Sequence, residues 1–284
     1  MTPPVEDQHL PTLPATRRPA AEPAPGDPFR FPADGPAGVL VLHGFTGVPF
    51  SVRPWGRALH EAGADVVGPV LPGHGTRWED LAAVRWEQWR DHAAQQVQEL
   101  RARHDVVVVC GLSMGGALAL HLAAILPVDG VVALNPALSL VSRTARLAPA
   151  LHRAVPSVPG VGDDISLPGV TEHAYPRTPV AGVAELGRFM ARTRRMLPAV
   201  TAPVLVLRSQ HDHVVSDASH FHVLRRVGGD VELVRLSQSF HVATLDREAD
   251  VVSARSVRFL DDLLAGRNPV TARPLRPGLR GGRR

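Results

Sequence analysis

The chain has 284 residues, of which 44% are hydrophobic and 20% charged, and its mean hydropathy is close to zero. This length is enough for one large hydrophobic core but short for two independent domains, so we expect a single soluble globular domain. No apolar run approaches the roughly 20 residues that a membrane-spanning helix needs, which excludes an integral membrane protein. The single cysteine, Cys110, excludes an internal disulfide and is expected to act as a small buried hydrophobe.

The net charge of +4 comes from the C-terminal end of the chain. Residues 267–284 contain six arginines and no acidic residue, so removing these arginines leaves the rest of the chain at about −2. This tail is also rich in Pro and Gly, and we expect residues 266–284 to be disordered. No aromatic residues lie between its arginines, and no nucleic-acid partner is expected.

The first 27 residues form a second biased end, rich in Pro and Ala. They carry acidic residues early and lack the apolar stretch of a secretory signal peptide, so we expect a disordered leader and a cytoplasmic protein. The folded domain is accordingly expected to span residues 28–265.

Between these ends, short apolar strands alternate with helical segments. In chain order, the predicted elements are a strand at 38–43, a helix at 51–63, a strand at 64–68, a helix at 86–103, a strand from 106, a helix ending near 126, a strand at 130–135, a helix at 181–196, and strands at 203–209 and 231–236, each followed by a helix. This alternation predicts an α/β fold with a mostly parallel open sheet, helices on both faces, and ligand chemistry at the carboxyl ends of the strands. The irregular segment at about 136–179 is too long for a simple connection and predicts an inserted cap.

A valine strand runs directly into Gly111-Leu112-Ser113-Met114-Gly115 and then into an Ala- and Leu-rich helix. Gly-x-Ser-x-Gly between a strand and a helix is the pattern of a nucleophile elbow, a strained turn that exposes the serine hydroxyl. The two glycines are needed so that the strand and the helix can approach closely. We therefore predict that Ser113 is a nucleophile at the carboxyl edge of the sheet.

A serine nucleophile needs a general base and an acid that orients the base. The strand at 203–209 ends just before Asp212, and the strand at 231–236 ends before the loop that contains His241. The order serine, acid, histidine is the one expected of this fold. We predict His241 as the base and Asp212 as the acid. Asp217 and Asp246 are rival acids, but each appears at the start of a helix, where capping is the simpler role.

Acyl transfer also requires hydrogen-bond donors for the developing oxyanion. The residue after the nucleophile, Met114, and the turn after the first strand, which contains Phe45, are expected to supply them through backbone N–H groups. His74, in Pro-Gly-His-Gly, is expected to organise its own loop.

Five motifs occur in the order His43-Gly44-Phe45-Thr46-Gly47, Gly73-His74-Gly75-Thr76, Gly111-Leu112-Ser113-Met114-Gly115-Gly116, Asp212-His213-Val214-Val215 and Phe240-His241-Val242-Ala243-Thr244-Leu245-Asp246. Together they resemble the bacterial monoacylglycerol lipases and related small carboxylesterases of the α/β-hydrolase superfamily, over about residues 26–264. The resemblance implies the triad Ser113, Asp212 and His241, with the N–H groups of Phe45 and Met114 as the oxyanion hole.

The segment at 169–179 is similar to the end of the cap in these lipases. The resemblance implies that Glu172 holds the glycerol hydroxyls, and a carboxylate that accepts hydrogen bonds from a diol is physically reasonable. Residues 137–160 depart from the family pattern, so the resemblance implies no preferred acyl-chain length. Their apolar composition suits a lid over a fatty chain.

The sequence therefore predicts a serine hydrolase that cleaves carboxylic esters through an acyl-enzyme, with a monoacylglycerol as the expected substrate and no metal or organic cofactor. A general carboxylesterase or thioesterase, a cofactor-free perhydrolase, and a non-catalytic binding protein of the same fold are the alternatives. An epoxide hydrolase or dehalogenase is disfavoured, because those relatives carry aspartate at the position of Ser113. A transient membrane contact through the cap or the basic tail, and a monomer or homodimer, are left open.

Overall fold

The computed structural model describes residues 24–142 and 144–270. In these residues one sheet has seven strands in the order β1-β3-β2-β4-β5-β8-β9. The strands are β1 Phe29–Phe31, β2 Ala37–Leu42, β3 Asp65–Gly68, β4 Val106–Leu112, β5 Gly130–Leu134, β8 Val204–Ser209 and β9 Val231–Leu236. All neighbouring strands pair in parallel except β1, which is antiparallel to β3. The predicted mostly parallel sheet is confirmed; the three-residue edge strand β1 was not predicted, because so short a strand has no readable pattern.

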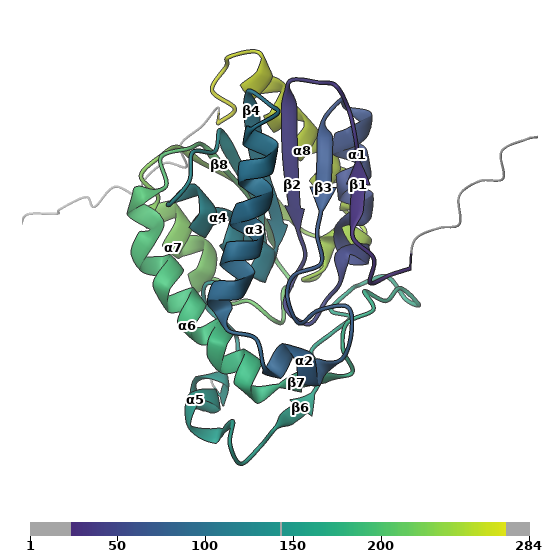
Figure 1. Cartoon of the computed structure of the whole chain (residues 1–284), viewed down its shortest axis with the longest axis vertical. Helices are drawn as coiled ribbons and strands as arrows, with labels where there is room; N and C mark the ends of the chain where they lie inside the picture. The colour runs from purple at the N-terminus through teal and green to yellow at the C-terminus, as the bar shows by residue number, and fades with distance from the viewer. Residues whose placement is uncertain (1–23, 143, 271–284) are drawn as a thin grey trace, which may run out of the picture.

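Helices cover both faces of this sheet (Figure 1). They are α1 Arg53–Glu61, α2 Trp78–Ala82, α3 Trp86–Arg101, α4 Met114–Ala123, α5 Ala148–Leu151, α6 Val180–Met196, α7 Ala218–Arg226 and α8 Ala249–Leu264, with the 3-10 helices η1 Pro49–Val52, η2 Thr144–Leu147, η3 Leu197–Ala199 and η4 Ala243–Leu245. One core lies between the sheet and α3, α4, α6 and α7, and the other lies between the sheet and α1 and α8. Every residue of β2 is buried, because alternate side chains enter opposite cores.

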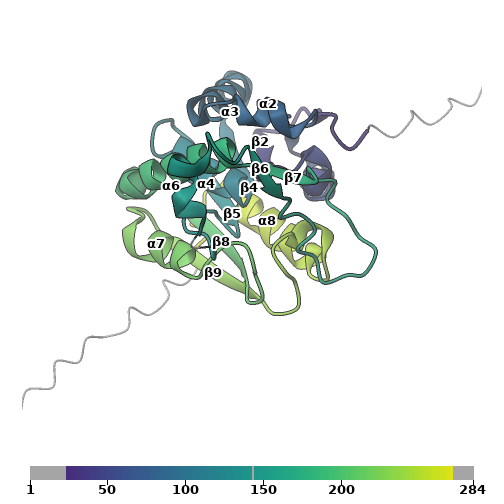
Figure 2. The same ribbon diagram turned by 90° about the horizontal axis from the view of Figure 1, so that it is seen from below.

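The segment between β5 and α6 lies across the carboxyl ends of the strands, at the bottom of Figure 1. It contains η2, α5 and a two-stranded antiparallel hairpin of β6 Ser157–Pro159 and β7 Arg177–Pro179. Figure 2, seen from below, shows β6 and β7 in front of the end of the sheet. This segment, called the cap below, therefore covers the edge where the sequence places the chemistry.

Parts of the two predicted tails pack against the domain. The N–H of Phe50 donates to Pro25 O (3.2 Å), and the guanidinium of Arg53 donates to Ala24 O (2.9 Å) and Asp27 O (3.1 Å). Val270 is buried in the core under α8. The rest of the predicted leader, 1–23, and of the predicted tail, 271–284, lies outside the described residues. None of the helices in the described ranges is long and apolar enough to cross a membrane.

Candidate active site

Ser113 occupies the turn between β4 and α4 with φ 58° and ψ −115°, a strained conformation for a residue with a side chain. A Cβ atom on Gly111 would lie 2.2 Å from the carbonyl carbon of Gly115, and one on Gly115 would lie 2.2 Å from Leu42 O. Neither position can hold a larger residue without moving backbone. The N–H of Ser113 donates to Leu134 O (2.9 Å), which ties the turn to the neighbouring strand β5.

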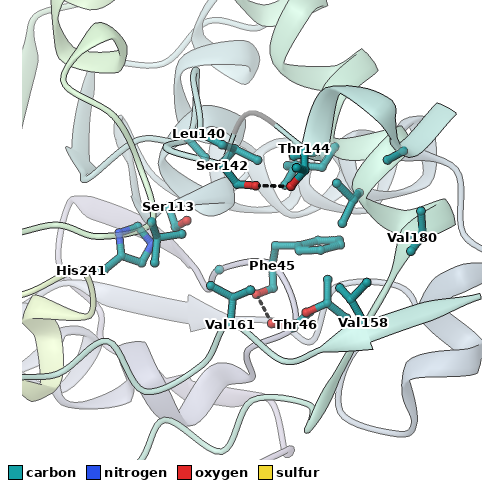
Figure 3. A pocket seen from close by; sticks show the side chains of 18 of the residues that line it. Phe45, Thr46, Ser113, Leu140, Ser142, Thr144, Val158, Val161, Val180 and His241 are labelled. Atoms are coloured by element: carbon teal, nitrogen blue, oxygen red, sulfur yellow. Dashed lines mark hydrogen bonds between the residues drawn. The ribbon is translucent and has the colours of Figure 1, made fainter. Parts of the chain in front are cut away.

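His241 and Asp212 meet at the same edge of the sheet, from the loops that follow β9 and β8. The Nδ1 atom of His241 lies 2.9 Å from Asp212 Oδ2. The side chains of His241 and Ser113 lie next to each other and line one cavity (Figure 3). In this structure the Ser113 hydroxyl is not hydrogen-bonded to His241. Such bonds are often long in a free enzyme and shorten when substrate binds.

The carboxylate of Asp212 is fully buried and surrounded by donors. The N–H groups of Val214 (2.9 Å) and Val215 (2.8 Å) donate to Oδ1, and the Arg208 guanidinium donates to Oδ2. Burial alone would raise the pKa of Asp212, but His241, the Val215 amide and Arg208 together hold it below its ordinary value. Asp212 is therefore ionised at neutral pH and suited to fix a histidine in one tautomer.

Neither rival acid contacts His241 among the described residues. Asp217 occupies the N-cap position of α7, where its largely exposed carboxylate pairs with Arg208 Nη2 at 3.2 Å and makes no side-chain cap bond. Asp246 does not open α8, whose N-cap is Glu248, so that expectation is wrong. The Asp246 carboxylate instead accepts the N–H groups of Ser166 and Phe240, both at 2.8 Å. It thereby joins the cap to the loop that follows β9.

The N–H groups of Phe45 and Met114, the expected oxyanion donors, have no hydrogen-bond acceptor among the described residues. Met114 is the first residue of α4, so its N–H has no partner within the helix. Among the described residues, the N–H of Phe45 donates to no other group. The Phe45 turn also lies against the nucleophile, since a Cβ atom on Gly44 would be 3.4 Å from the Cβ atom of Ser113.

His43 orders this turn, a role that the sequence reasoning missed. Its Nε2 accepts the N–H of Leu71 (3.1 Å), so the proton is on Nδ1, which donates to Gly44 O (2.9 Å). Burial lowers the pKa of His43 to about 4, which keeps the ring neutral. The signal was its position directly after β2. His74 behaves as expected: it donates to Pro72 O (3.1 Å) and does not line the cavity.

The cavity beside Ser113 and His241 has a volume of about 290 Å³. Its apolar lining comes mainly from the cap and from α6, and these residues are Ala137, Leu140, Ala145, Ala148, Leu151, Val155, Val158, Val161, Val180, Val183 and Leu186. Glu172 lines the same cavity and is 8% exposed. Its Oε1 accepts the N–H of Asp163 (3.1 Å), and burial raises its pKa. The cavity thus combines an apolar wall with a buried carboxylate.

Two further residues hold the backbone of His241, and the sequence analysis identified neither. The Nδ2 group of Asn135 donates to His241 O (2.8 Å) and to Ser209 Oγ (3.0 Å). Asp164, in the cap, accepts the N–H of His241 (3.2 Å) and binds His213 Nδ1 (2.7 Å). Asn135 directly follows β5 at the carboxyl edge, which was an available signal. Asp164 lies in an irregular segment and had none.

In the described part of the chain, no three His, Cys, Asp or Glu side chains are grouped so that they could hold a metal ion. Cys110 is buried in β4, and burial raises the pKa of its thiol, in keeping with a packing role.

The model of the alpha/beta hydrolase family matches residues 39–272. The chain belongs to this family. It is 37% identical over 237 residues to the thermostable monoacylglycerol lipase of Bacillus sp. (strain H-257), which covers 82% of this chain and 93% of that lipase. It is 29% identical over 238 residues to a carboxylesterase of Bacillus subtilis (strain 168), which covers 83% of this chain and 96% of the esterase.

The chain is also similar to a solved structure. This structure, from the work on LipS and LipT, two metagenome-derived lipolytic enzymes, superimposes with a TM-score of 0.81 and 35% identity, over 84% of this chain and 98% of that one. These relatives of the alpha/beta hydrolase family are lipases and esterases, which are carboxylic ester hydrolases.

Proposed function

We propose that the protein is a serine carboxylic ester hydrolase that releases a fatty acid and glycerol from monoacylglycerols. The observation that carries the proposal is the position of Ser113 and His241 in one apolar cavity, with Asp212 bound to His241 behind it and the buried carboxylate of Glu172 in the wall. The similarity to a monoacylglycerol lipase along most of both chains supports the same substrate class.

In the proposed reaction, Nε2 of His241 takes the proton of Ser113 Oγ as that oxygen attacks the ester carbonyl carbon. The negative charge that develops on the carbonyl oxygen is accepted by the N–H groups of Phe45 and Met114. The C–O bond to glycerol then breaks, and His241 protonates the departing oxygen. A water molecule, deprotonated by His241, attacks the acyl-enzyme, and Ser113 recovers its proton as the fatty acid leaves. Asp212 stays ionised and stabilises the imidazolium.

Two kinds of lining residue in the cavity support the proposed substrate class. An acyl chain fits the apolar wall formed by the cap and α6. The carboxylate of Glu172 is nearly buried, and only one of its oxygens has a hydrogen-bond donor, Asp163 N–H, among the described residues. Hydroxyl groups of a glycerol head would supply the missing donors, whereas a diacylglycerol or triacylglycerol presents fewer hydroxyls and more bulk at this point.

The proposal is tested first with p-nitrophenyl decanoate, on the wild type and on Ser113→Ala. We expect Ser113→Ala to lose at least about 10⁴-fold in kcat. Equal hydrolysis by the two proteins would contradict the proposed serine hydrolase activity. The wild type is then compared on monodecanoyl-, didecanoyl- and tridecanoylglycerol, and a preference for the first is expected. Rapid turnover of p-nitrophenyl decanoate with no preference among the glycerides favours a general carboxylesterase.

Glu172→Gln separates head-group recognition from chemistry. We expect it to raise KM for monodecanoylglycerol about tenfold, the usual scale for losing a hydrogen bond to a charged group, and to leave p-nitrophenyl decanoate hydrolysis unchanged. Glu79→Gln, on the exposed surface of α2, is the control and changes neither substrate. An equal effect of Glu172→Gln on both substrates contradicts the head-group role.

A transient contact between the cap and a lipid surface belongs to the same proposal. Exposed apolar side chains gather on the cap, and these are Val141, Leu147, Leu151, Val155, Val158 and Val161. Several of them also line the cavity, so a lipid could pass from an aggregate to Ser113 without crossing water. Cosedimentation with neutral phosphatidylcholine vesicles should fall for Leu147→Ser and Val161→Ser and stay unchanged for Ile125→Ser, an exposed apolar residue after α4.

A further inference from the structure

A second hollow, of about 500 Å³, lies behind one wall of the active-site cavity. The two share four lining residues, Leu140, Ser142, Ala145 and Val183. The hydroxyls of Ser142 and Thr144, 2.9 Å apart, lie at this wall (Figure 3). The other described residues around the second hollow are Ser139, Arg146, Pro149, Ala184, Gly187, Arg188, Met190, Ala191, Arg194 and His222. The proposed reaction makes no use of this hollow.

Part of the lining of the hollow is positively charged. Arg146, Arg188 and Arg194 line it, and no Asp or Glu is among its described lining residues. Arg188 is neutralised by Glu185, one turn earlier on α6. Arg146 has no carboxylate partner within the described ranges, and the guanidinium of Arg194 donates to a backbone carbonyl, Leu138 O.

Arg194 lies among other positive charges. Burial, together with the charges of Arg226, Arg146 and Arg195, lowers the pKa of Arg194. Burial and the charges of Arg194 and Arg226 likewise lower the pKa of His222, at the edge of the same hollow. A bound anion would relieve this repulsion.

Much of the remaining lining is apolar, because it includes Leu140, Pro149, Val183 and Met190 beside several alanines. A bare inorganic anion would leave this wall uncovered. A ligand with one aliphatic chain and one anionic head would match both the apolar and the charged lining residues. The fatty acid that the proposed reaction releases on the other side of the shared wall has this chemistry.

We propose that this hollow is a second binding site for a single-chain fatty acid, with its carboxylate at Arg146 and Arg194 and its chain along Val183 and Met190. The choice of a fatty acid as the ligand rests on the proposed function. The mixed charged and apolar lining is observed independently of that function. A released acid held here would occupy the space behind Leu140 and Val183, so product could accumulate beside the active-site cavity without blocking Ser113.

The site can be filled by a substitution that the fold tolerates. Gly187 lines the hollow from α6, and a Cβ atom at this position would meet no atom within 4 Å. Gly187→Leu should therefore place a side chain in the hollow, and leucine is a better helix former than glycine. The variant is expected to fold at least as stably as the wild type.

The experiment titrates decanoate, 1-decanol and inorganic phosphate into Ser113→Ala protein by calorimetry. We expect decanoate to occupy one site in addition to any in the active-site cavity. Gly187→Leu should remove that site, and Arg146→Glu should weaken it about tenfold, the usual scale for losing a charged hydrogen bond. Arg153→Glu, an exposed cap residue outside the hollow, is the matched control and should leave it unchanged. Decanol and phosphate should bind this site at least tenfold more weakly.

An unchanged decanoate titration in both Gly187→Leu and Arg146→Glu overturns the proposal. Phosphate binding that equals decanoate binding and survives Gly187→Leu also overturns it, because the arginines would then act as a bare anion patch. Since Ser113→Ala cannot turn over an ester, these outcomes do not depend on hydrolysis. Failure of the wild type to hydrolyse any ester would overturn the proposed function and leave the binding result standing.

Discussion

At the floor of the active-site cavity, Asp212 and His241 are each held by several groups, whereas the cap above them consists of short elements with few buried side chains. Asp212 is bound by two backbone amides and Arg208, and His241 is bound through its ring and through both of its backbone polar groups. In the cap, η2 and α5 have four residues each, and only Ala148 of the two is buried. The floor thus holds the groups of the proposed reaction in fixed positions. The cap supplies an apolar wall, suited to an aliphatic chain, that has fewer fixed contacts.

The largest expected effect tests the floor. Asp212→Asn keeps the shape of the side chain but removes the charge that fixes the His241 tautomer. We expect kcat for p-nitrophenyl decanoate to fall about 10³- to 10⁴-fold. Asp217→Asn, which alters the other carboxylate on Arg208, is the matched control and should change kcat less than about threefold. A small effect of Asp212→Asn would show that another group orients the base.

Alanine substitutions at Gly115 and Gly187 compare how tightly the two regions are packed. Gly115→Ala, at the floor, would place a Cβ atom 2.2 Å from Leu42 O, so we expect it to lower the free energy of unfolding by several kcal/mol or to prevent folding. Gly187→Ala, below the cap, meets nothing within 4 Å and should raise the free energy of unfolding by about 1 kcal/mol. Urea denaturation measures both. Equal destabilisation by the two substitutions would remove the contrast.

Asp164 is one of the residues that join the two regions, and its loss should lower kcat less than the loss of the Asp212 charge. Asp164 of the cap accepts the N–H of His241 and binds His213. We expect Asp164→Ala to lower kcat about tenfold with little change in KM for p-nitrophenyl decanoate, because it loosens the base and leaves the apolar wall intact. Asp164→Asn keeps a side-chain acceptor and should restore most of the rate. A change confined to KM would show that Asp164 acts only on the cap.

Two buried histidines, His43 and His74, should make the stability of the fold depend on pH. Burial lowers the pKa of His43 to about 4, and burial with the nearby His43 lowers that of His74 to about 3, from ordinary values of 6.5. The unfolded chain therefore binds protons near pH 6.5 that the folded chain binds only near pH 4 and below. Their contribution to stability is complete above pH 6.5 and is lost as the pH falls towards 4.

Substitution of His74 tests whether this histidine causes the pH dependence of stability. In urea denaturation at pH 8, 6, 5 and 4, His74→Asn should show a shallower loss of stability with falling pH than the wild type. His152→Asn, in the cap, should show the same slope as the wild type. Identical slopes for His74→Asn and the wild type would contradict the neutral state of the buried ring.

Local sequence patterns determined much of this molecule. The valine strand and Gly-x-Ser-x-Gly predicted the turn at Ser113, because a strand, a tight turn and a buried helix each leave a pattern within about 20 residues. The strand ends predicted the region of Asp212 and His241, since parallel strands bring their carboxyl ends to one edge. The cap was predicted only as an irregular insertion, and the hairpin of β6 and β7 was not, because its strands have three residues each and lie 17 residues apart.

Only the tertiary structure decided which groups support the site. Asn135 and Asp164 reach the backbone of His241 from two different segments, and no short-range pattern links them to it. The position of Asp246 shortly before α8 suggested a helix cap, which does not form. Asp246 instead binds Ser166 of the cap, a contact that depends on how the cap packs against the sheet. The charged hollow behind the active-site cavity likewise arises from arginines of the cap and of α6 that are far apart in sequence. Sequence patterns encode local backbone geometry, whereas long-range hydrogen bonds and charge clusters exist only once packing has brought distant segments together.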